Sequence, residues 1–319
     1  MLLSEAIETL AIATKVNGRS ARTVGAYREK LGHLVAFLGD VPVESITTAD
    51  LRRYLADLMD RPTRYGGHPR VGETPGSLSP YTIGGRARAL KRLFNFLEDE
   101  GVIEANPARR VKVPRPKQRK PKGIKRADFL ALLATTKAGT VHDLRDRAIM
   151  LFLADTGCRV GGLCGLQVHE VNLTAGLASV TEKGDRTRLV PFTQTTAAAL
   201  SDWLQVRPED RGPWLFVGMG PTAHDRMAAN GVNRILQRRA TEAGIEGPVN
   251  PHSFRHAFAR DFLMHGGDLA SLADLMGHSS VTVTRDYYAV FAIQELQEKH
   301  ARHSPIAQIF EGTGDNGRL

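Results

Sequence analysis

Apolar side chains recur at helical spacing through the first third of the chain. After a polar start at Ser20, they return every three or four positions, at Val24, Tyr27, Leu31, Leu34, Val35 and Leu38. This spacing predicts an amphipathic helix. A second helix is expected to begin at Ser79, an N-cap followed by Pro80 at the first helical position, and to end at Gly101. Between them, residues 61–78 are rich in Gly, Pro and Arg and predict a long loop.

The pattern becomes mixed in the second part of the chain. Residues 127–134 and 143–155 predict helices, whereas residues 178–182 and 187–192 predict two strands joined by a tight polar turn. Helical periodicity returns from Pro213 and is interrupted at residues 244–251 and 265–267. The predicted fold class is therefore mainly α with a small antiparallel β-sheet, in an all-α N-terminal domain and a mixed α/β second domain.

A basic segment separates the two parts. Residues 109–126 contain ten Lys or Arg residues, three prolines and no acid. Proline and like-charge repulsion favour an extended, unpacked chain there. We expect domains at 1–113 and 127–310, a linker at 114–126 and a disordered tail at 311–319. The linker is either a solvated spacer or a contact with a nucleic-acid backbone, and the absence of acid favours the contact.

Composition and charge narrow the class of protein. The chain of 319 residues has 43 Lys plus Arg against 34 Asp plus Glu, a net charge of +9. This excess points to a polyanionic partner, nucleic acid first and an anionic membrane surface second. The longest apolar run, residues 148–154, is too short to span a membrane, and Glu5 and Glu8 interrupt any secretory signal. The two cysteines, Cys158 and Cys164, exclude a disulfide framework and favour a reducing, cytoplasmic location.

Two motifs each contain one basic residue at a junction between predicted elements. Arg159 lies among glycines at the end of an apolar helix, which predicts a half-buried guanidinium that needs an anionic partner. Lys183 lies in the turn between the two predicted strands, where a lysine is usually only solvated.

A third motif opens a helix after Pro251. His252 and His256 have the spacing of a zinc-binding pair, but Ser253 stands where the zinc motif has glutamate, and no cysteine pair completes a site. We favour a pairing of His252 with Arg255, three residues apart, as an acid/base beside a fork of phosphate donors.

The fourth motif follows a helix that ends at Gly277. His278, a hydroxyl-rich turn, and the neighbours Tyr287 and Tyr288 succeed one another there. A tyrosine can attack a phosphate covalently when cations surround its phenol. Two arginines, a lysine, two histidines and a tyrosine on one basic chain form a metal-free set for phosphoryl transfer.

These motifs resemble those of the tyrosine recombinases, the phage-integrase family of site-specific DNA recombinases. The resemblance covers nearly the whole chain, with all four motifs in the family's order. Residues 156–159 resemble the box of the first catalytic arginine, and residues 182–184 with 188–191 resemble the catalytic-lysine hairpin. Residues 252–256 are similar to the His-x-x-Arg box, and residues 276–280 to the last box. Tyr287 follows His278 by nine residues, the family's spacing for the nucleophile.

The resemblance implies a mechanism and a set of catalytic residues: Arg159, Lys183, His252, Arg255, His278 and Tyr287. Tyr287 would cleave a DNA strand, leaving a 3′-phosphotyrosyl link and a free 5′-hydroxyl. The two arginines would neutralise the non-bridging phosphate oxygens, and Lys183 would protonate the departing 5′-oxygen. His252 would exchange a proton with the nucleophile, and His278 would hydrogen-bond the phosphate. No metal, ATP or other cofactor is expected, because the phosphotyrosine conserves the bond energy.

The implied partner is double-stranded DNA with a specific recombination site, bound by a tetramer on two duplexes in which a terminal helix after Tyr287 docks on a neighbouring subunit. Accessory DNA-bending proteins are compatible with the resemblance, and no membrane partner is expected. The candidate DNA-binding residues lie on the basic face of the second predicted helix and in the linker: Arg86, Lys91, Lys117, Arg119, Lys120 and Lys122.

Three alternatives stay open at this point: a type IB topoisomerase-like enzyme, a catalytically weakened DNA-binding protein of the same fold, and a zinc hydrolase. The second is suggested by Gly162, because family members usually carry an acidic residue three positions after the first arginine. We expect Gly162→Glu to raise the cleavage rate if the backbone there is helical. A fall would mean that another group has taken the space.

Overall fold

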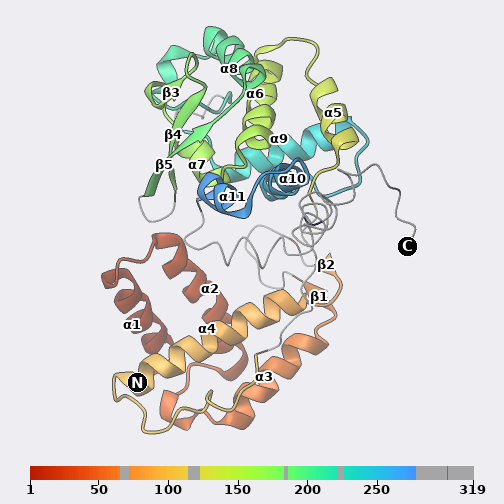
Figure 1. Cartoon of the computed structure of the whole chain (residues 1–319). Helices are drawn as coiled ribbons and strands as arrows, with labels where there is room; N and C mark the ends of the chain where they lie inside the picture. The colour runs from red at the N-terminus through yellow and green to blue at the C-terminus, as the bar shows by residue number, and fades with distance from the viewer. Residues whose placement is uncertain are drawn as a thin grey trace, which may run out of the picture. The chain divides into compact units, whose positions relative to one another are not determined.

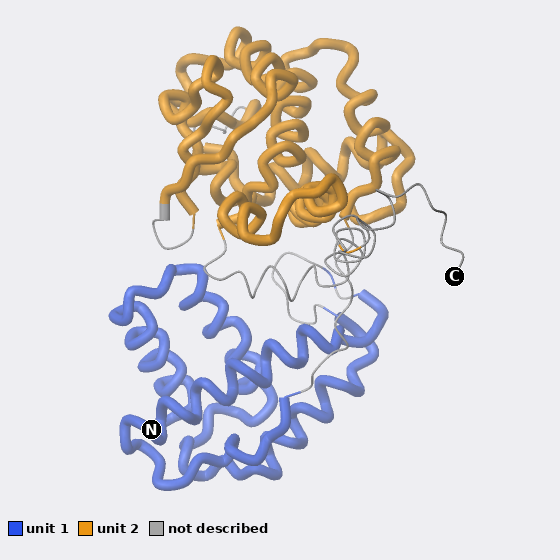
Figure 2. Tube along the Cα trace, in the orientation of Figure 1, with its two compact units in different colours: residues 1–119 blue, residues 120–319 orange. Residues whose placement is uncertain are grey.

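The structure is a computed structural model of the chain that describes residues 1–64, 72, 74–113, 123–182, 186–220, 226–277 and 300. The chain divides into two compact units, residues 1–119 and 120–319 (Figure 2). Each unit has its own hydrophobic core. The predicted class, mainly α with small antiparallel sheets, is confirmed (Figure 1). None of the described helices is both long and apolar enough to cross a membrane.

Helices build the first unit. They are α1 (Leu3–Val16), α2 (Ala21–Leu38), the 3₁₀ turn η1 (Val43–Ser45), α3 (Thr48–Asp60) and α4 (Pro80–Asp99). The starts predicted for two of them are confirmed, because Ser20 and Ser79 cap α2 and α4 by accepting from the third backbone N–H of each helix. The apolar stripes of these helices meet in one core around Leu34, Tyr54 and Phe94.

The segment predicted as a loop, residues 61–78, contains a short antiparallel pair. Strand β1 (Thr63–Arg64) pairs with β2 (Thr74–Pro75), and the Gly76 N–H donates to the Pro62 carbonyl over 2.7 Å. Gly76 has a φ of +118°, which a glycine adopts without strain. The loop prediction was therefore wrong at its two ends, where the chain doubles back closely enough for backbone pairing.

Both described ends of the basic segment are packed, which corrects the prediction that all of it is unpacked. At the first end, Val111 is buried, and Arg109 forms an ion pair of 2.7 Å with Glu98. At the other end, Ile124 is buried, and its N–H donates to the Ser253 carbonyl over 3.0 Å. Apolar residues within the charged run pack against the nearest hydrophobic core. The free energy gained by burying them does not show in a count of charges, which is why the prediction missed it. Residues 114–122 lie outside the described part of the chain.

The second unit combines helices with a three-stranded sheet. In chain order its elements are α5 (Arg126–Ala134), α6 (Val141–Thr156), α7 (Val160–Gly165), η2 (Val168–Glu170), β3 (Val171–Asn172), β4 (Leu177–Glu182), β5 (Arg186–Pro191), α8 (Gln194–Val206), η3 (Glu209–Arg211), α9 (Ala229–Glu242), α10 (Pro251–Met264) and α11 (Leu269–Met276). The sheet is antiparallel in the order β3-β4-β5, which confirms the predicted hairpin. Helix α6 contacts α8, α9 and α10, and its residues 148–153 are all buried (Figure 1).

Helical structure resumes later than predicted from Pro213. Leu215, Phe216 and Val217 form a short buried run with one isolated bridge, between Val217 and Arg226, and the next helix begins only at Ala229. A short apolar run of this kind cannot be assigned to helix or extended chain by periodicity, which explains the error.

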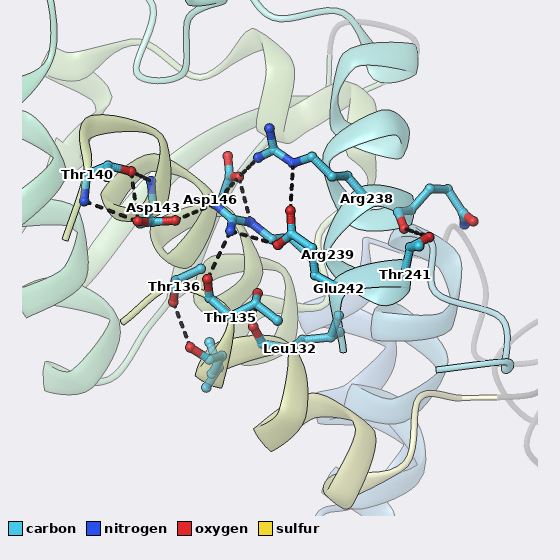
Figure 3. Close-up of polar contacts among 12 residues, drawn as sticks. Leu132, Thr135, Thr136, Thr140, Asp143, Asp146, Arg238, Arg239, Thr241 and Glu242 are labelled. Carbon is cyan, nitrogen blue, oxygen red and sulfur yellow. Dashed lines mark hydrogen bonds and ion pairs between the residues drawn. The ribbon is translucent and has the colours of Figure 1, made fainter. Parts of the chain in front are cut away.

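An ion-pair network joins α6 to α9 (Figure 3). The fully buried Asp146 accepts hydrogen bonds from Arg145, Arg238 and Arg239 over 2.5–3.1 Å. Arg239, itself only 5% exposed, also donates to Asp143 over 2.7 Å. Buried charges are tolerated only when they are paired and hydrogen-bonded in this way.

Candidate active site

A tight junction between α6 and α7 sets the position of Arg159. Helix α6 ends at Thr156, and its C-cap Gly157 adopts the left-handed conformation with φ of +56°. A β-carbon at this position would lie 2.5 Å from the ring of Phe258 on α10. Glycine is thus required both for the turn and for the close approach of α10. Arg159 follows as the N-cap residue of α7.

The guanidinium of Arg159 is half-buried and paired with a carboxylate, as its surroundings in the sequence predict. Its side chain is 37% exposed, and Nη1 forms an ion pair with Oε2 of Glu182. The same nitrogen donates to the carbonyls of Met276 and Gly277 over 3.4 and 3.5 Å. Among the described residues, all the hydrogen bonds of this side chain use Nη1. One edge of the guanidinium is therefore tethered.

Arg255 reaches the same place from α10. It is buried, and it donates through Nη1 to the Gly157 carbonyl and through Nη2 to the Met276 carbonyl, each over 2.6 Å. Arg159 and Arg255 therefore share an acceptor at the end of α11, although they come from distant parts of the chain. The structure brings these two predicted site residues together.

The histidines of α10 differ in exposure. Asn250 caps the helix by accepting from the Ser253 N–H over 3.0 Å, which places His252 in the first turn. His252 is exposed, and its ring centroid lies 6.5 Å from that of the half-buried His256. Burial, together with His252 and Arg255, lowers the pKa of His256. In the described part of the chain, no group of three or more His, Cys, Asp or Glu could hold a metal ion.

Three of the six predicted catalytic residues lie outside the described residues: Lys183, His278 and Tyr287. Their chain neighbours are described. Strand β4 ends at Glu182, directly before the lysine, and α11 ends at Met276 with Gly277 as its left-handed cap, directly before His278.

The predicted DNA-binding residues divide in the same way. The four in the linker, Lys117, Arg119, Lys120 and Lys122, lie outside the described residues. Arg86 on α4 is half-buried, and burial lowers its pKa. Lys91 is also half-buried and donates to the Arg109 carbonyl over 3.3 Å.

The structure adds two residues to the site that were not predicted from the sequence, Glu182 and Arg188. Glu182 is 7% exposed, and Arg188, 14% exposed, donates to its Oε1 over 3.2 Å and to the Leu275 carbonyl. Burial opposes ionisation of this carboxyl, but Arg188, Arg159 and Arg255 outweigh it, and the pKa of Glu182 lies below its ordinary value. The sequence contained a signal for Glu182. Side chains two residues apart on a strand point to the same face, so Glu182 lies on the face of β4 that carries the buried Val180.

The structure reverses the expectation for Gly162. The backbone there is helical, as that expectation required. However, a β-carbon at position 162 would lie less than 3.0 Å from Cγ1 of the buried Val180 and 3.4 Å from Cγ of Glu182. A larger residue would displace the carboxylate that already holds Arg159. We therefore expect Gly162→Glu to lower the cleavage rate.

Comparisons with known proteins identify the family of this chain. The model of the phage integrase family matches residues 123–293. Tyrosine recombinase XerD of Listeria monocytogenes serovar 1/2a is 30% identical over 299 residues, 91% of this chain and 95% of that protein. Tyrosine recombinase XerC of Alcanivorax borkumensis is also 30% identical over 299 residues, 92% of this chain and 88% of that protein.

A solved structure shows the same fold. The Tn1549 transposon integrase in complex with transposon right end DNA has a TM-score of 0.72 at 18% identity, covering 93% of this chain and 99% of that chain. Because the family matches more than half of the chain and XerD is 30% identical along nearly all of it, this chain belongs to the phage integrase family, the tyrosine recombinases.

Proposed function

We propose that this tyrosine recombinase cuts and rejoins DNA at a specific site through a 3′-phosphotyrosyl intermediate. The observation that carries the proposal is the convergence of Arg159 and Arg255 on the Met276 carbonyl, two residues before His278. Two guanidinium groups at one point can neutralise the non-bridging oxygens of a phosphodiester, where negative charge builds up in the transition state.

The remaining steps follow from the residue types. The phenol oxygen of Tyr287 attacks the scissile phosphorus and its proton passes to His252, while the bond from phosphorus to the 5′-oxygen breaks. Lys183 gives a proton to that leaving oxygen. The 5′-hydroxyl of a partner strand then attacks the phosphotyrosine and releases the enzyme. His278 donates a hydrogen bond to the phosphate throughout.

We assign DNA recognition to both units. Residues 1–113 form the core-binding domain, in which Arg86 and Lys91 contact the duplex. Residues 114–126 form a linker along the DNA backbone, and residues 127–310 form the catalytic domain. Xer-type relatives and DNA-bound integrases support double-stranded DNA as the partner. We further propose a tetramer on two duplexes and a cytoplasmic location, where the free Cys158 and Cys164 stay reduced.

Covalent capture tests the proposal. The protein is incubated with fragmented DNA of its host, denatured, and recovered with the DNA ends attached to it. One recurrent sequence is expected, attached through the 3′-phosphate to the peptide that contains Tyr287. Tyr287→Phe should bind the captured sequence but form no adduct, whereas Tyr288→Phe should still form one.

Two outcomes would contradict the proposal. Absence of any denaturation-resistant adduct would refute the phosphotyrosyl intermediate. Adducts scattered over unrelated sequences, together with relaxation of a supercoiled plasmid that lacks the captured sequence, would indicate a topoisomerase instead.

A further inference from the structure

The carboxylate of Glu182 contacts both the backbone and the side chain of Arg159. Oε1 accepts the Arg159 N–H over 3.2 Å, and Oε2 pairs with its Nη1. Oε1 also accepts from Arg188 Nη2 over 3.2 Å. A single buried carboxylate therefore holds the main chain at the start of α7 and the guanidinium that projects from it.

The sheet brings Glu182 to this position. Strands β4 and β5 pair with Val180 opposite Arg188, so Glu182 is the diagonal neighbour of Arg188 on the same face. Strand β4 also contacts α7. Contact is this close because Gly162 has no side chain, and the site of its missing β-carbon lies 3.4 Å from Cγ of Glu182. The strand fills the space that a side chain at position 162 would need.

We propose that Glu182 positions Arg159 for the scissile phosphate, in place of the acidic residue that the family usually carries three positions after this arginine. The inference rests on the function proposed above, since it requires Arg159 to bind that phosphate. Glu182 tethers Nη1, whereas Nε and Nη2 make no hydrogen bond to any described residue. This leaves one edge of the guanidinium fork for phosphate oxygens.

The charge balance fits a positioning role. Three guanidinium groups, those of Arg159, Arg188 and Arg255, surround the one carboxylate, so the cluster remains cationic and still attracts a phosphate. Arg188 donates to Oε1 of Glu182, whereas the guanidinium of Arg159 pairs with Oε2. The same surroundings lower the pKa of Glu182, so it stays ionised at neutral pH.

The test uses the full chain and a nicked duplex that carries the captured sequence, with the rate of covalent adduct formation as readout. Glu182→Gln keeps the size of the side chain and removes its charge. We expect the rate to fall about 10- to 100-fold, the effect of misplacing a catalytic group. DNA binding in a gel-shift assay and circular dichroism should be unchanged. Thr181→Val is the matched control, because the exposed Thr181 precedes Glu182 on β4 and pairs with Thr187 instead.

A second duplex separates positioning from scaffolding. Its scissile phosphate is replaced by a methylphosphonate, which lacks the negative charge that Arg159 neutralises. If Glu182 acts through Arg159, the ratio of wild-type to Glu182→Gln rates should shrink toward one on this duplex. An equal loss on both duplexes, an unchanged rate or a faster rate on the normal duplex would overturn the inference.

Failure of the proposed function has a different signature. If the wild-type protein forms no adduct, both proposals fail. If Tyr287→Phe forms the same adduct, only the choice of Tyr287 as the nucleophile is wrong. If wild type and Tyr287→Phe behave as expected while Glu182→Gln equals wild type, only the role of Glu182 is refuted.

Discussion

Replacing each of the two adjacent glycines near the start of α7 by alanine should change the free energy of unfolding in opposite directions. Gly161→Ala adds a β-carbon with nothing within 4 Å, so only the gain in helix propensity remains. That gain stabilises by about 0.5–1 kcal/mol. Gly162→Ala adds the same atom less than 3.0 Å from Cγ1 of Val180, whose side chain is fully buried. Because the valine cannot swing into solvent, overpacking should cost about 1–3 kcal/mol.

Urea unfolding followed by tryptophan fluorescence measures both variants. The two tryptophans of the chain, Trp203 and Trp214, lie in the second unit, so the signal reports the unit that contains α7. With a slope of about 3 kcal/mol per molar urea, the midpoint should rise by about 0.2–0.3 M for Gly161→Ala and fall by about 0.3–1 M for Gly162→Ala.

A double-mutant cycle identifies the contact itself. Val180→Ala removes the Cγ1 methyl group that a β-carbon at position 162 would meet. The double variant with Gly162→Ala should therefore lose less stability than the sum of the losses of the two single variants. A Gly162→Ala protein as stable as Gly161→Ala would refute the close packing of β4 on α7, and with it the reason given for the glycine.

Three further outcomes are expected. Asp146→Ala should destabilise the second unit by about 3–5 kcal/mol in the same urea assay, because it leaves buried cations unpaired; the exposed Asp210→Asn should change it by less than about 0.5 kcal/mol. Since the pKa of His256 is lowered in the folded state, the unfolded chain binds the proton more tightly, and stability should fall as pH drops below about 6.5. His256→Gln should flatten that fall between pH 7.5 and 5.5. Burial raises the pKa of Cys158 and Cys164 to about 11, so iodoacetamide at pH 8 should label neither thiol in the native protein and both in urea, as measured by intact mass.

Local sequence signals were sufficient for the elements whose ends are marked by capping or turn residues. Ser79 and Pro80 predicted the start of α4, and the polar turn after residue 182 predicted the hairpin of β4 and β5. The buried run from Leu215 to Val217 carried no such signal, and its non-helical form depends on contacts with residues elsewhere in the chain, such as Leu166 and Arg226. Periodicity reports what a segment needs to bury, and the partner that buries it is not encoded locally.

The sequence alone determined the order of the motifs, the need of Arg159 for an anionic partner, and the family resemblance. Only the tertiary structure decided that this partner is Glu182, because the contact joins a strand to a helix start 23 residues away. It also decided the meaning of Gly162, which looked like a lost carboxylate and proved to be the space that lets β4 approach α7. The physical reason is that a chain can meet one electrostatic requirement from several positions, and packing selects which of them is close enough to do so.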